Sequence, residues 1–340
     1  MSIPGKDREK ADLALLIGSG AGEILRSALM NMGQPAVIRG WEVHSIHHRP
    51  GAGVTAGYSV TLDRILPNGA HMRVEEYLCA STARLSHPNT PGLVYVSKGD
   101  STFSVWRYPA DPELPALFLA CSPEHMSALL GMPVSVELMS YRPTRRAVVR
   151  VRAANSVSYA KVARPPQVES LAKRHIMLSR AGIPAPPVLI HDVRGLLVIG
   201  AANGIPLSTA ISRGMGRNAA PLLGSLTALL NALPREALSL SHRPAWADRS
   251  THYAHAAGTA LPEERVRCEA VAHGIHELLA SSDPGPLVPV HGDFYEANVL
   301  MEGEAVTSLL DVDSLGPGYR VDDLACLLGH VSVLDHLAPA

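Results

Sequence analysis

The stretch HGDFYEANVL, at residues 291–300, is the part of this sequence that decides its interpretation. It follows the apolar run GPLVPV at residues 285–290, so we expect a buried strand to end just before His291. Asp293 and Asn298 then stand five residues apart in a loop that leads into another apolar strand. Three polar groups of this kind, gathered in a loop between two strands, indicate a functional site.

Two further carboxylates follow this loop. The segment SLLDVDSLGPG, at residues 308–318, places Asp311 and Asp313 at the end of a second expected strand. Phosphoryl transfer needs a carboxylate that receives a hydroxyl proton, together with oxygen ligands that hold Mg²⁺ against the phosphates. Asp293 supplies the first group, whereas Asn298 and Asp311 supply the ligands, with Asp313 as an additional ligand or a support for one. The set is chemically complete for this reaction.

The motifs HGDFYEANVL and LLDVDSLGPGYRVDDLA resemble those of the aminoglycoside phosphotransferase and choline kinase group. The likeness runs from about Val134 to the end of the chain. It implies an α+β, protein-kinase-like fold with a small β-rich lobe and a helical lobe, and ATP and Mg²⁺ as cofactors. The roles that it implies are catalytic base for Asp293, metal ligand for Asn298 and Asp311, and structural anchor for Asp323.

The candidate phosphate-binding residues lie upstream. Lys161, within the strand pattern VSYAKVAR, is placed to meet the α and β phosphates, and Glu169 in the next helix is its candidate partner. An exposed strand lysine and a solvated glutamate are the alternatives. The turn expected to cover the phosphates has no glycine, and Arg145 and Arg146 either supply positive charge there or form a solvated hairpin tip.

Adenine is expected against the link between the two lobes. The strand GLLVIGA ends in small side chains, and a hinge offers unpaired backbone N–H and C=O groups. We therefore assign nucleotide contacts to the backbone of Ile199, Gly200 and Ala201.

The periodicity of the chain predicts three regions. We expect a β-rich extension over residues 1–130, a kinase-like β lobe over 131–202 and a helical lobe over 203–340. Residues 43–50, VHSIHHRP, and residues 136–143, VELMSYRP, suggest that the extension is a degenerate copy of the β lobe. Two separate strand-ending turns are the alternative. Helices are expected over residues 21–32, 123–130, 167–182, 220–233 and 262–282.

The composition is that of a globular protein. The chain has 340 residues, 46% of them hydrophobic, and can bury the cores of two or three domains. A net charge of −1 gives no overall case for binding nucleic acid or an anionic membrane. The four cysteines form no CxxC pair, and the start MSIPGKDREK has no signal-peptide pattern. We expect a cytoplasmic protein without a membrane or nucleic-acid partner; the sequence leaves its oligomeric state open.

Three other patterns resemble known binding motifs but depart from them. GSGAGEIL, at residues 18–25, has the wrong glycine spacing for a dinucleotide-binding turn. DVDSLGPGYRVD imitates a calcium loop, but Pro317 lies within it and a strand precedes it. HSIHH, at residues 44–48, divides its histidines between the two faces of a strand, so packed or surface side chains are favoured over a metal site.

The leading hypothesis is an ATP-dependent kinase that phosphorylates a hydroxyl group of a small molecule, such as an aminoglycoside or a sugar. Only 11 residues separate Asp311 from Asp323, which leaves no room for a peptide-docking activation segment. A maltokinase-like sugar kinase is one alternative, because an extra amino-terminal module resembles the arrangement in that group. A nucleotide-binding pseudokinase is the other, suggested by the glycine-free turn and by the 17 residues that follow Asp323.

Overall fold

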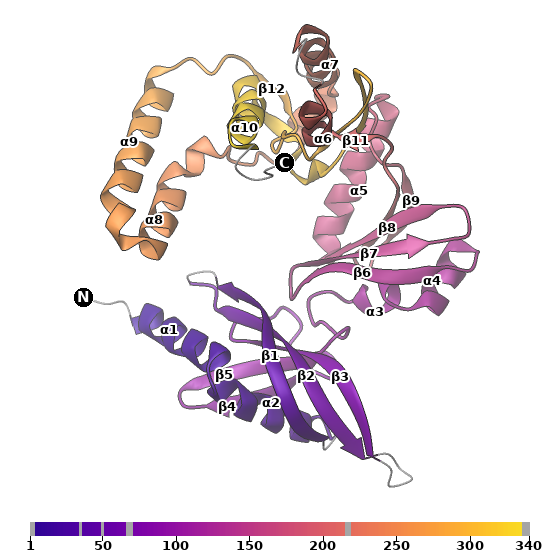
Figure 1. The fold of residues 1–340 in the computed structure, drawn as a ribbon, viewed down its shortest axis with the longest axis vertical. Helices are drawn as coiled ribbons and strands as arrows, with labels where there is room; N and C mark the ends of the chain where they lie inside the picture. Colours follow the sequence, from indigo (N-terminus) through magenta and orange to yellow (C-terminus); the bar gives the residue numbers. More distant parts are fainter. Residues whose placement is uncertain (1–3, 34–35, 49–50, 66–70, 215–218, 335–340) are drawn as a thin grey trace. The chain divides into compact units, whose positions relative to one another are not determined.

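The computed structural model describes residues 4–33, 36–48, 51–65, 71–214 and 219–334 (Figure 1). The chain forms two compact units. The first unit contains residues 1–169 and 190–198, and the second contains residues 170–189 and 199–340. The first is rich in strands and the second is mainly helical, so the predicted α+β class, β-rich first and helical afterwards, is confirmed.

The first sheet of the first unit follows two helices. Its strands lie in the order β1-β2-β3-β5-β4, and the neighbouring strands are antiparallel. Apolar residues of α2 pack with the inner faces of β2, β3 and β5 in one buried core. The elements are α1 (Pro4–Ile17), α2 (Gly20–Asn31), β1 (Ala36–His48), β2 (Val54–Ile65), β3 (His71–Ser81), β4 (Val94–Lys98) and β5 (Ser101–Arg107).

A second five-stranded sheet follows two short helices. The second of these, α4 (Pro123–Leu130), begins where the Ser122 hydroxyl accepts the His125 N–H and ends at the left-handed Gly131, as the sequence predicts. The strand order is β6-β7-β8-β10-β9. The elements are α3 (Leu117–Ala120), β6 (Ser135–Arg142), β7 (Arg146–Arg152), β8 (Val157–Ala163), α5 (Pro165–Arg180), β9 (Val188–Asp192) and β10 (Leu196–Gly200).

The two sheets share one topology. Each follows a pair of helices, and in each the fifth strand in sequence lies between the third and the fourth. In the suggested repeat segments, residues 43–48 fall on β1 and residues 136–142 fall on β6, the first strand of each sheet; residues 49–50 lie outside the described residues. The duplication stays a prediction, although this shared order is what a duplication would produce.

A cluster of tyrosines joins the two sheets within the first unit. The Tyr141 ring of β6 lies 5.9 Å from Tyr77 of β3 and 5.3 Å from Tyr108, measured between centroids. The Tyr141 hydroxyl donates to the Asp111 carboxylate at 2.7 Å and accepts the Trp106 indole N–H at 3.2 Å. These three polar side chains between the sheets are therefore hydrogen-bonded to one another.

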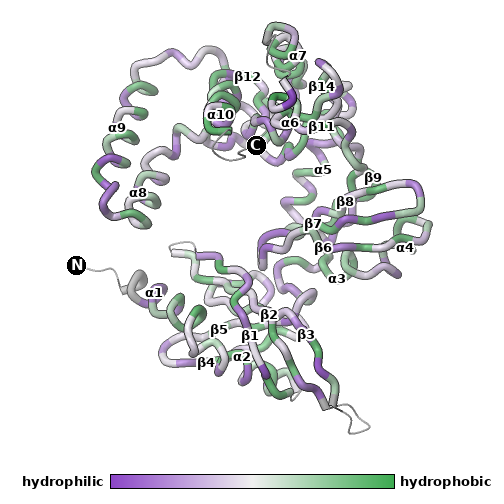
Figure 2. Tube along the Cα trace, viewed as in Figure 1, coloured by the Kyte–Doolittle hydropathy of each residue, from purple (hydrophilic) through white to green (hydrophobic). Residues whose placement is uncertain are grey.

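The second unit is mainly helical, with short strands at its candidate site. Figure 2 shows that α7 is apolar along most of its length. The strands pair as β11-β13-β14 and β12-β15. The elements are β11 (Ile205–Pro206), α6 (Leu207–Ser212), α7 (Ala219–Asn231), α8 (Ser250–Ala260), α9 (Arg265–Ser281), β12 (Leu287–Val290), β13 (Val299–Glu302), β14 (Ala305–Leu309), β15 (Gly316–Tyr319) and α10 (Arg320–Ser332), with single 3₁₀ turns at Arg235–Ser239, Ala247–Arg249, Pro262–Glu264 and Val312–Ser314.

The helices show where sequence patterns succeed and fail. Each of the five predicted helices is present, with ends that differ by a few residues, whereas α1, α3, α6, α8 and α10 were not predicted. Within the described ranges, no single helix is long and apolar enough to cross a membrane. The pair formed by Arg8–Ile17 and Gly20–Asn31 passes by length and composition only, with an 80° bend between its halves.

Candidate functional site

The first turn of α10 holds the loop that follows β12. Asp323, which is 1% exposed, accepts the His291 N–H at 2.9 Å and the Gly292 N–H at 2.8 Å. Arg320 lies 3.4 Å from the same carboxylate. Two backbone donors on one buried side chain fix the direction in which the chain leaves the strand. Asp323 thus takes a structural position, as the resemblance implies.

Gly292 turns the chain toward the candidate base. Its φ of +78° is in the left-handed region, and a Cβ there would lie 2.8 Å from the Ser314 carbonyl oxygen. Only glycine fits a left-handed turn packed this closely against another backbone segment. The next residue, Asp293, is half-buried and lines a pocket.

Leu310 links the two loops that carry the candidate site. The His291 ring donates from Nε2 to the Leu310 carbonyl at 2.8 Å, while the Leu310 N–H donates to the Asn298 carbonyl at 2.8 Å. Asp311 is the next residue in the chain. The loop with Asp293 and Asn298 is thereby hydrogen-bonded, from both of its ends, to the residue that precedes Asp311.

The backbone at Asp311 departs from ordinary strand geometry. Its φ and ψ are 49° and 54°, a left-handed conformation that is uncommon for a residue with a side chain. Burial raises the pKa of Tyr295, and the charges of Asp293 and Asp311 raise it further. Both carboxylates therefore act on the same phenol, as expected if they face a common space.

Asn298 and Asp311 fit a divalent cation. Asn298 is 6% exposed, and its side-chain nitrogen donates to the Asp293 carbonyl at 3.0 Å, which leaves the amide oxygen as its ligand atom. A carboxylate and an amide oxygen suit Mg²⁺, which commonly completes its shell with water and phosphate oxygens. In the described part of the chain, no group of three or more His, Cys, Asp or Glu side chains could hold a metal.

Asp313 differs from Asn298 and Asp311, because its neighbour is Arg174. It is exposed and lies close enough to Arg174 to raise the pKa of that guanidinium, although burial lowers it more. Arg174 donates from Nε to the Leu315 carbonyl at 3.0 Å, so it supports the segment after Asp311. The metal role of Asp313 stays a prediction.

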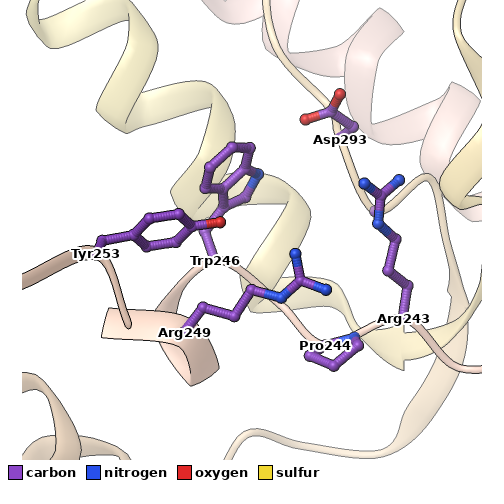
Figure 3. Close-up of a pocket in the computed structure, with 7 residues that line it drawn as sticks. Arg243, Pro244, Trp246, Arg249, Tyr253 and Asp293 are labelled. Atoms are coloured by element: carbon purple, nitrogen blue, oxygen red, sulfur yellow. The ribbon is translucent and has the colours of Figure 1, made fainter. Parts of the chain in front are cut away.

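A pocket opens beside Asp293, and sequence reasoning did not find most of its wall. The segment between α7 and α8 contributes Trp246, whose ring stacks on Tyr253 of α8 with the ring centroids 5.3 Å apart. No periodicity or motif marks that segment, and its only visible signal is a tryptophan in a chain with three. The lining residues are Arg243, Pro244, Trp246, Arg249, Tyr253, Gly292 and Asp293 (Figure 3).

Lys161 and Glu169 both belong to the first unit. Lys161 lies in the middle of β8, opposite Val148 of β7, on the face turned away from the core residues Ala160 and Val162. Glu169 is exposed on α5. The position of Lys161 on a strand before a helix agrees with the sequence, while its pairing with Glu169 and its phosphate role stay predictions.

A buried carboxylate anchors the turn that carries the two arginines. Arg145 lies in the turn between β6 and β7, and Arg146 is the first residue of β7. Thr144 has a φ of 62°, and its N–H donates to the buried carboxylate of Asp111 at 2.8 Å. Burial lowers the pKa of His47 on β1, with a contribution from Arg145, so the turn lies near the first sheet. Phosphate binding by both arginines stays a prediction.

The expected adenine contacts need one correction. Ile199 is buried and Ala201 is exposed, at the point where the chain passes from the first unit to the second. The Gly200 N–H is not unpaired as expected, because it donates to the Pro187 carbonyl at 2.9 Å. The close packing of Pro187 against Gly200, which would put a Cβ 3.0 Å from the Pro187 ring, explains this bond. Nucleotide binding at these residues stays a prediction.

The comparison with protein families agrees with this arrangement. Residues 141–338 match the model of a family described as the phosphotransferase enzyme family. The chain belongs to this family. The match covers strands β7 to β10 of the second sheet and the loops with Asp293 and Asp311, so the predicted membership is confirmed for that part. No curated protein matches the sequence.

Solved phosphotransferase structures are similar to this family member. An aminoglycoside-3'-phosphotransferase of type VIII is 27% identical, with a TM-score of 0.43, over 61% of this chain and 82% of the other. The macrolide 2'-phosphotransferase from Brachybacterium faecium is 22% identical, with a TM-score of 0.41, over 58% and 73%. A thermostable mutant of aminoglycoside phosphotransferase APH(4)-Ia is 16% identical, with a TM-score of 0.45, over 64% and 83%.

Proposed function

We propose that this phosphotransferase moves the γ-phosphate of ATP to a hydroxyl group of a small molecule, at Asp293. One observation carries the proposal: Leu310 hydrogen-bonds to both His291 and Asn298 and so joins the two loops that carry Asp293, Asn298 and Asp311. A purely structural turn does not require two carboxylates and an amide in adjoining loops, whereas phosphoryl transfer uses one base and two oxygen ligands.

In the proposed reaction, the acceptor hydroxyl lies beside Asp293, in the pocket that this residue lines. The acceptor oxygen forms a bond to the γ-phosphorus, the bond to the β-phosphate oxygen breaks, and the hydroxyl proton passes to the Asp293 carboxylate. ADP leaves with the electron pair of the broken bond. Mg²⁺, when bound to Asn298 and Asp311, supplies positive charge to the phosphates.

The proposed acceptor is a small molecule. The interval between Asp311 and Asp323 is filled by a 3₁₀ turn, the short strand β15 and the start of α10. It leaves no segment that could dock a peptide. The APH(4)-Ia structures include a ternary complex with ADP and hygromycin B, which supports a nucleotide and a hydroxyl acceptor as the substrates here. A maltokinase-like sugar kinase is the alternative function, and we also propose a cytoplasmic location.

The proposal is tested with Asp293→Asn, which keeps the size of the side chain and removes the base. ADP release is measured with ATP, Mg²⁺ and a panel of sugars, amino alcohols and aminoglycosides. We expect acceptor-dependent turnover to fall by roughly 10² to 10⁴-fold, the contribution of a positioned base, while a fluorescent ADP analogue binds as before.

The matched control is Glu304→Gln, on the exposed turn between β13 and β14. Its turnover should equal that of the wild type. If Asp293→Asn keeps more than about a tenth of the activity, Asp293 is not the base. If no acceptor stimulates ADP release although nucleotide binds, the chain is a nucleotide-binding pseudokinase.

A further inference from the structure

The pocket beside Asp293 has two cationic side chains. Arg243 and Arg249 both line it, and Figure 3 shows both guanidinium groups pointing into the space on the side where Asp293 lies. A binding site for a polycation would place carboxylates here, because like charges at close range oppose binding. The charges of this wall instead favour an anionic group.

These two cations are not neutralised by ion pairs within the described ranges. Arg243 donates from Nη1 to the Ser314 hydroxyl, a neutral acceptor, and neither arginine lies within ion-pair distance of a described carboxylate. Arg243 also lies near a third guanidinium, that of Arg174, whose pKa burial lowers and Arg243 lowers further. Guanidinium groups held in this way can bind carboxylate or phosphate through two parallel hydrogen bonds.

The carboxylates nearby already serve the fold. Asp248 accepts the Ala245 N–H at 2.9 Å, and Asp322 accepts the Tyr319 N–H at 3.3 Å. Asp322 lines a neighbouring pocket with Arg243 and Trp246, where burial raises its pKa and so opposes its charged form. Among the described residues that line the pocket, Asp293, the proposed base, is the one carboxylate.

An exposed aromatic surface completes the pocket. Trp246 is 54% exposed and Tyr253 is 36% exposed, although their rings stack at an interplanar angle of 27°. Large aromatic rings that stay exposed beside a pocket are typical of binding surfaces, since burial against a ligand would stabilise them. The apolar faces of the rings suit the face of a sugar or another flat carbon skeleton.

We infer that this pocket binds the acceptor, and that the acceptor is an anionic hydroxy compound. Its carboxylate or phosphate group faces Arg243 and Arg249, and its ring or carbon face lies against Trp246. This inference rests on the proposed function, because it takes Asp293 as the group that receives the acceptor proton.

The test uses the full chain saturated with Mg²⁺ and AMP-PNP, so that no phosphate is transferred. Four probes share one ring and differ in charge: glucose 6-phosphate, glucuronate, glucose and glucosamine. Binding is measured by calorimetry and by the fluorescence of Trp246, which the Trp246→Phe variant removes. The two anions separate phosphate from carboxylate recognition.

We expect both anions to bind at least about tenfold more tightly than glucose, and glucosamine to bind most weakly. Arg243→Gln and Arg249→Gln should each weaken the binding of the anions about tenfold, as the loss of a charge-assisted hydrogen bond does. Arg267→Gln, on the exposed face of α9 with its side chain 82% exposed, is the matched control and should change nothing.

Three results of the binding measurements would overturn the inference: glucosamine binding as tightly as the anions, no binding of either anion at about 10 mM, or displacement of AMP-PNP by the anions. The last result would assign the arginines to the nucleotide. Turnover with cationic acceptors that is unaffected by Arg243→Gln would also remove the inference and leave the proposed function intact. Anion binding without ADP release from any acceptor would remove the proposed function instead.

Discussion

At the scale of single residues, Gly292 fixes the direction of the loop that carries Asp293. Gly292→Ala places a Cβ at a φ of +78° and 2.8 Å from the Ser314 carbonyl oxygen. We expect the second unit to lose roughly 1 to 3 kcal/mol of unfolding free energy, and ADP release to fall because Asp293 is displaced. Urea unfolding followed by Trp246 fluorescence, together with the ADP assay, measures both effects.

Gly224→Ala is the control for this substitution. Gly224 lies in α7, and a Cβ there meets nothing within 4 Å. Alanine should therefore leave stability unchanged or raise it by up to about 1 kcal/mol, as it does in exposed helix interiors. A Gly292→Ala protein as stable and as active as the wild type would show that the close approach to Ser314 does not shape the site.

Individual residues of the candidate site differ in how far sequence predicts them. Asp293, Asn298 and Asp311 stand at fixed spacings in short loops after strands, so a local pattern is enough to find them. Arg243 and Trp246 lie about 50 residues upstream in an irregular segment, and only the folded chain brings them beside Asp293. The Gly200 N–H was misjudged because its partner, the Pro187 carbonyl, comes from the start of another strand.

At the scale of strands, one acidic residue joins three strands of the first sheet. Asp63 of β2 lies between Arg39 of β1 and Arg73 of β3, at 2.6 and 2.9 Å. Hydrogen bonds from Arg73 and then Arg39 lower the pKa of Asp63 to about 2. A pKa that is lower in the folded state stabilises that state at pH values above the pKa of the unfolded chain, about 4. This stabilisation is lost as the pH falls toward 2.

Asp63→Asn should therefore remove part of the acid sensitivity of the first unit. Urea unfolding at several pH values between about 4 and 2, followed by Trp41 and Trp106 fluorescence, should give a flatter stability curve for this variant than for the wild type. Asp100→Asn is the control, because the Asp100 carboxylate makes no ion pair with the described residues. Parallel curves for wild type and Asp63→Asn would contradict the predicted linkage.

A tyrosine at the junction of the two sheets gives a second prediction. Tyr141→Phe removes a donor at 2.7 Å from the Asp111 carboxylate, which is 3% exposed, and removes the acceptor of the Trp106 N–H. Buried polar groups left without partners cost about 1 to 3 kcal/mol, so the urea midpoint should fall accordingly. Tyr159→Phe, on the half-buried face of β8, should cost much less; equal losses would contradict a special role for Tyr141.

The missed helices explain the limits of prediction at this scale. In α1, PGKDREKADLALLI, charged residues fill the first half and apolar residues the second, so no apolar stripe follows the helical period. In α8, STHYAHAAGTA, small and polar residues give little periodicity. The five predicted helices have clear apolar periodicity or clear ends, and most strands have clear alternation, so local patterns find them.

At the scale of the whole molecule, sequence patterns predict three regions, whereas the chain forms two compact units. The sequence separates a β-rich start from a helical end, whereas strand order and the tyrosine junction depend on contacts between distant residues. The first sheet and the second sheet form one compact unit, joined through Tyr77 and Tyr141. Local patterns carry no information on such pairings.

The central claim is that Asn298 and Asp311 bind one divalent cation beside Asp293, and Mn²⁺ binding tests it most directly. Mn²⁺ replaces Mg²⁺, and electron paramagnetic resonance counts the bound ion with AMP-PNP present. Asn298→Ala and Asp311→Ala should each weaken Mn²⁺ binding about tenfold or more, as loss of a ligand does, and Asp293→Asn should leave it nearly unchanged. Unaltered Mn²⁺ affinity in both ligand variants would contradict the account.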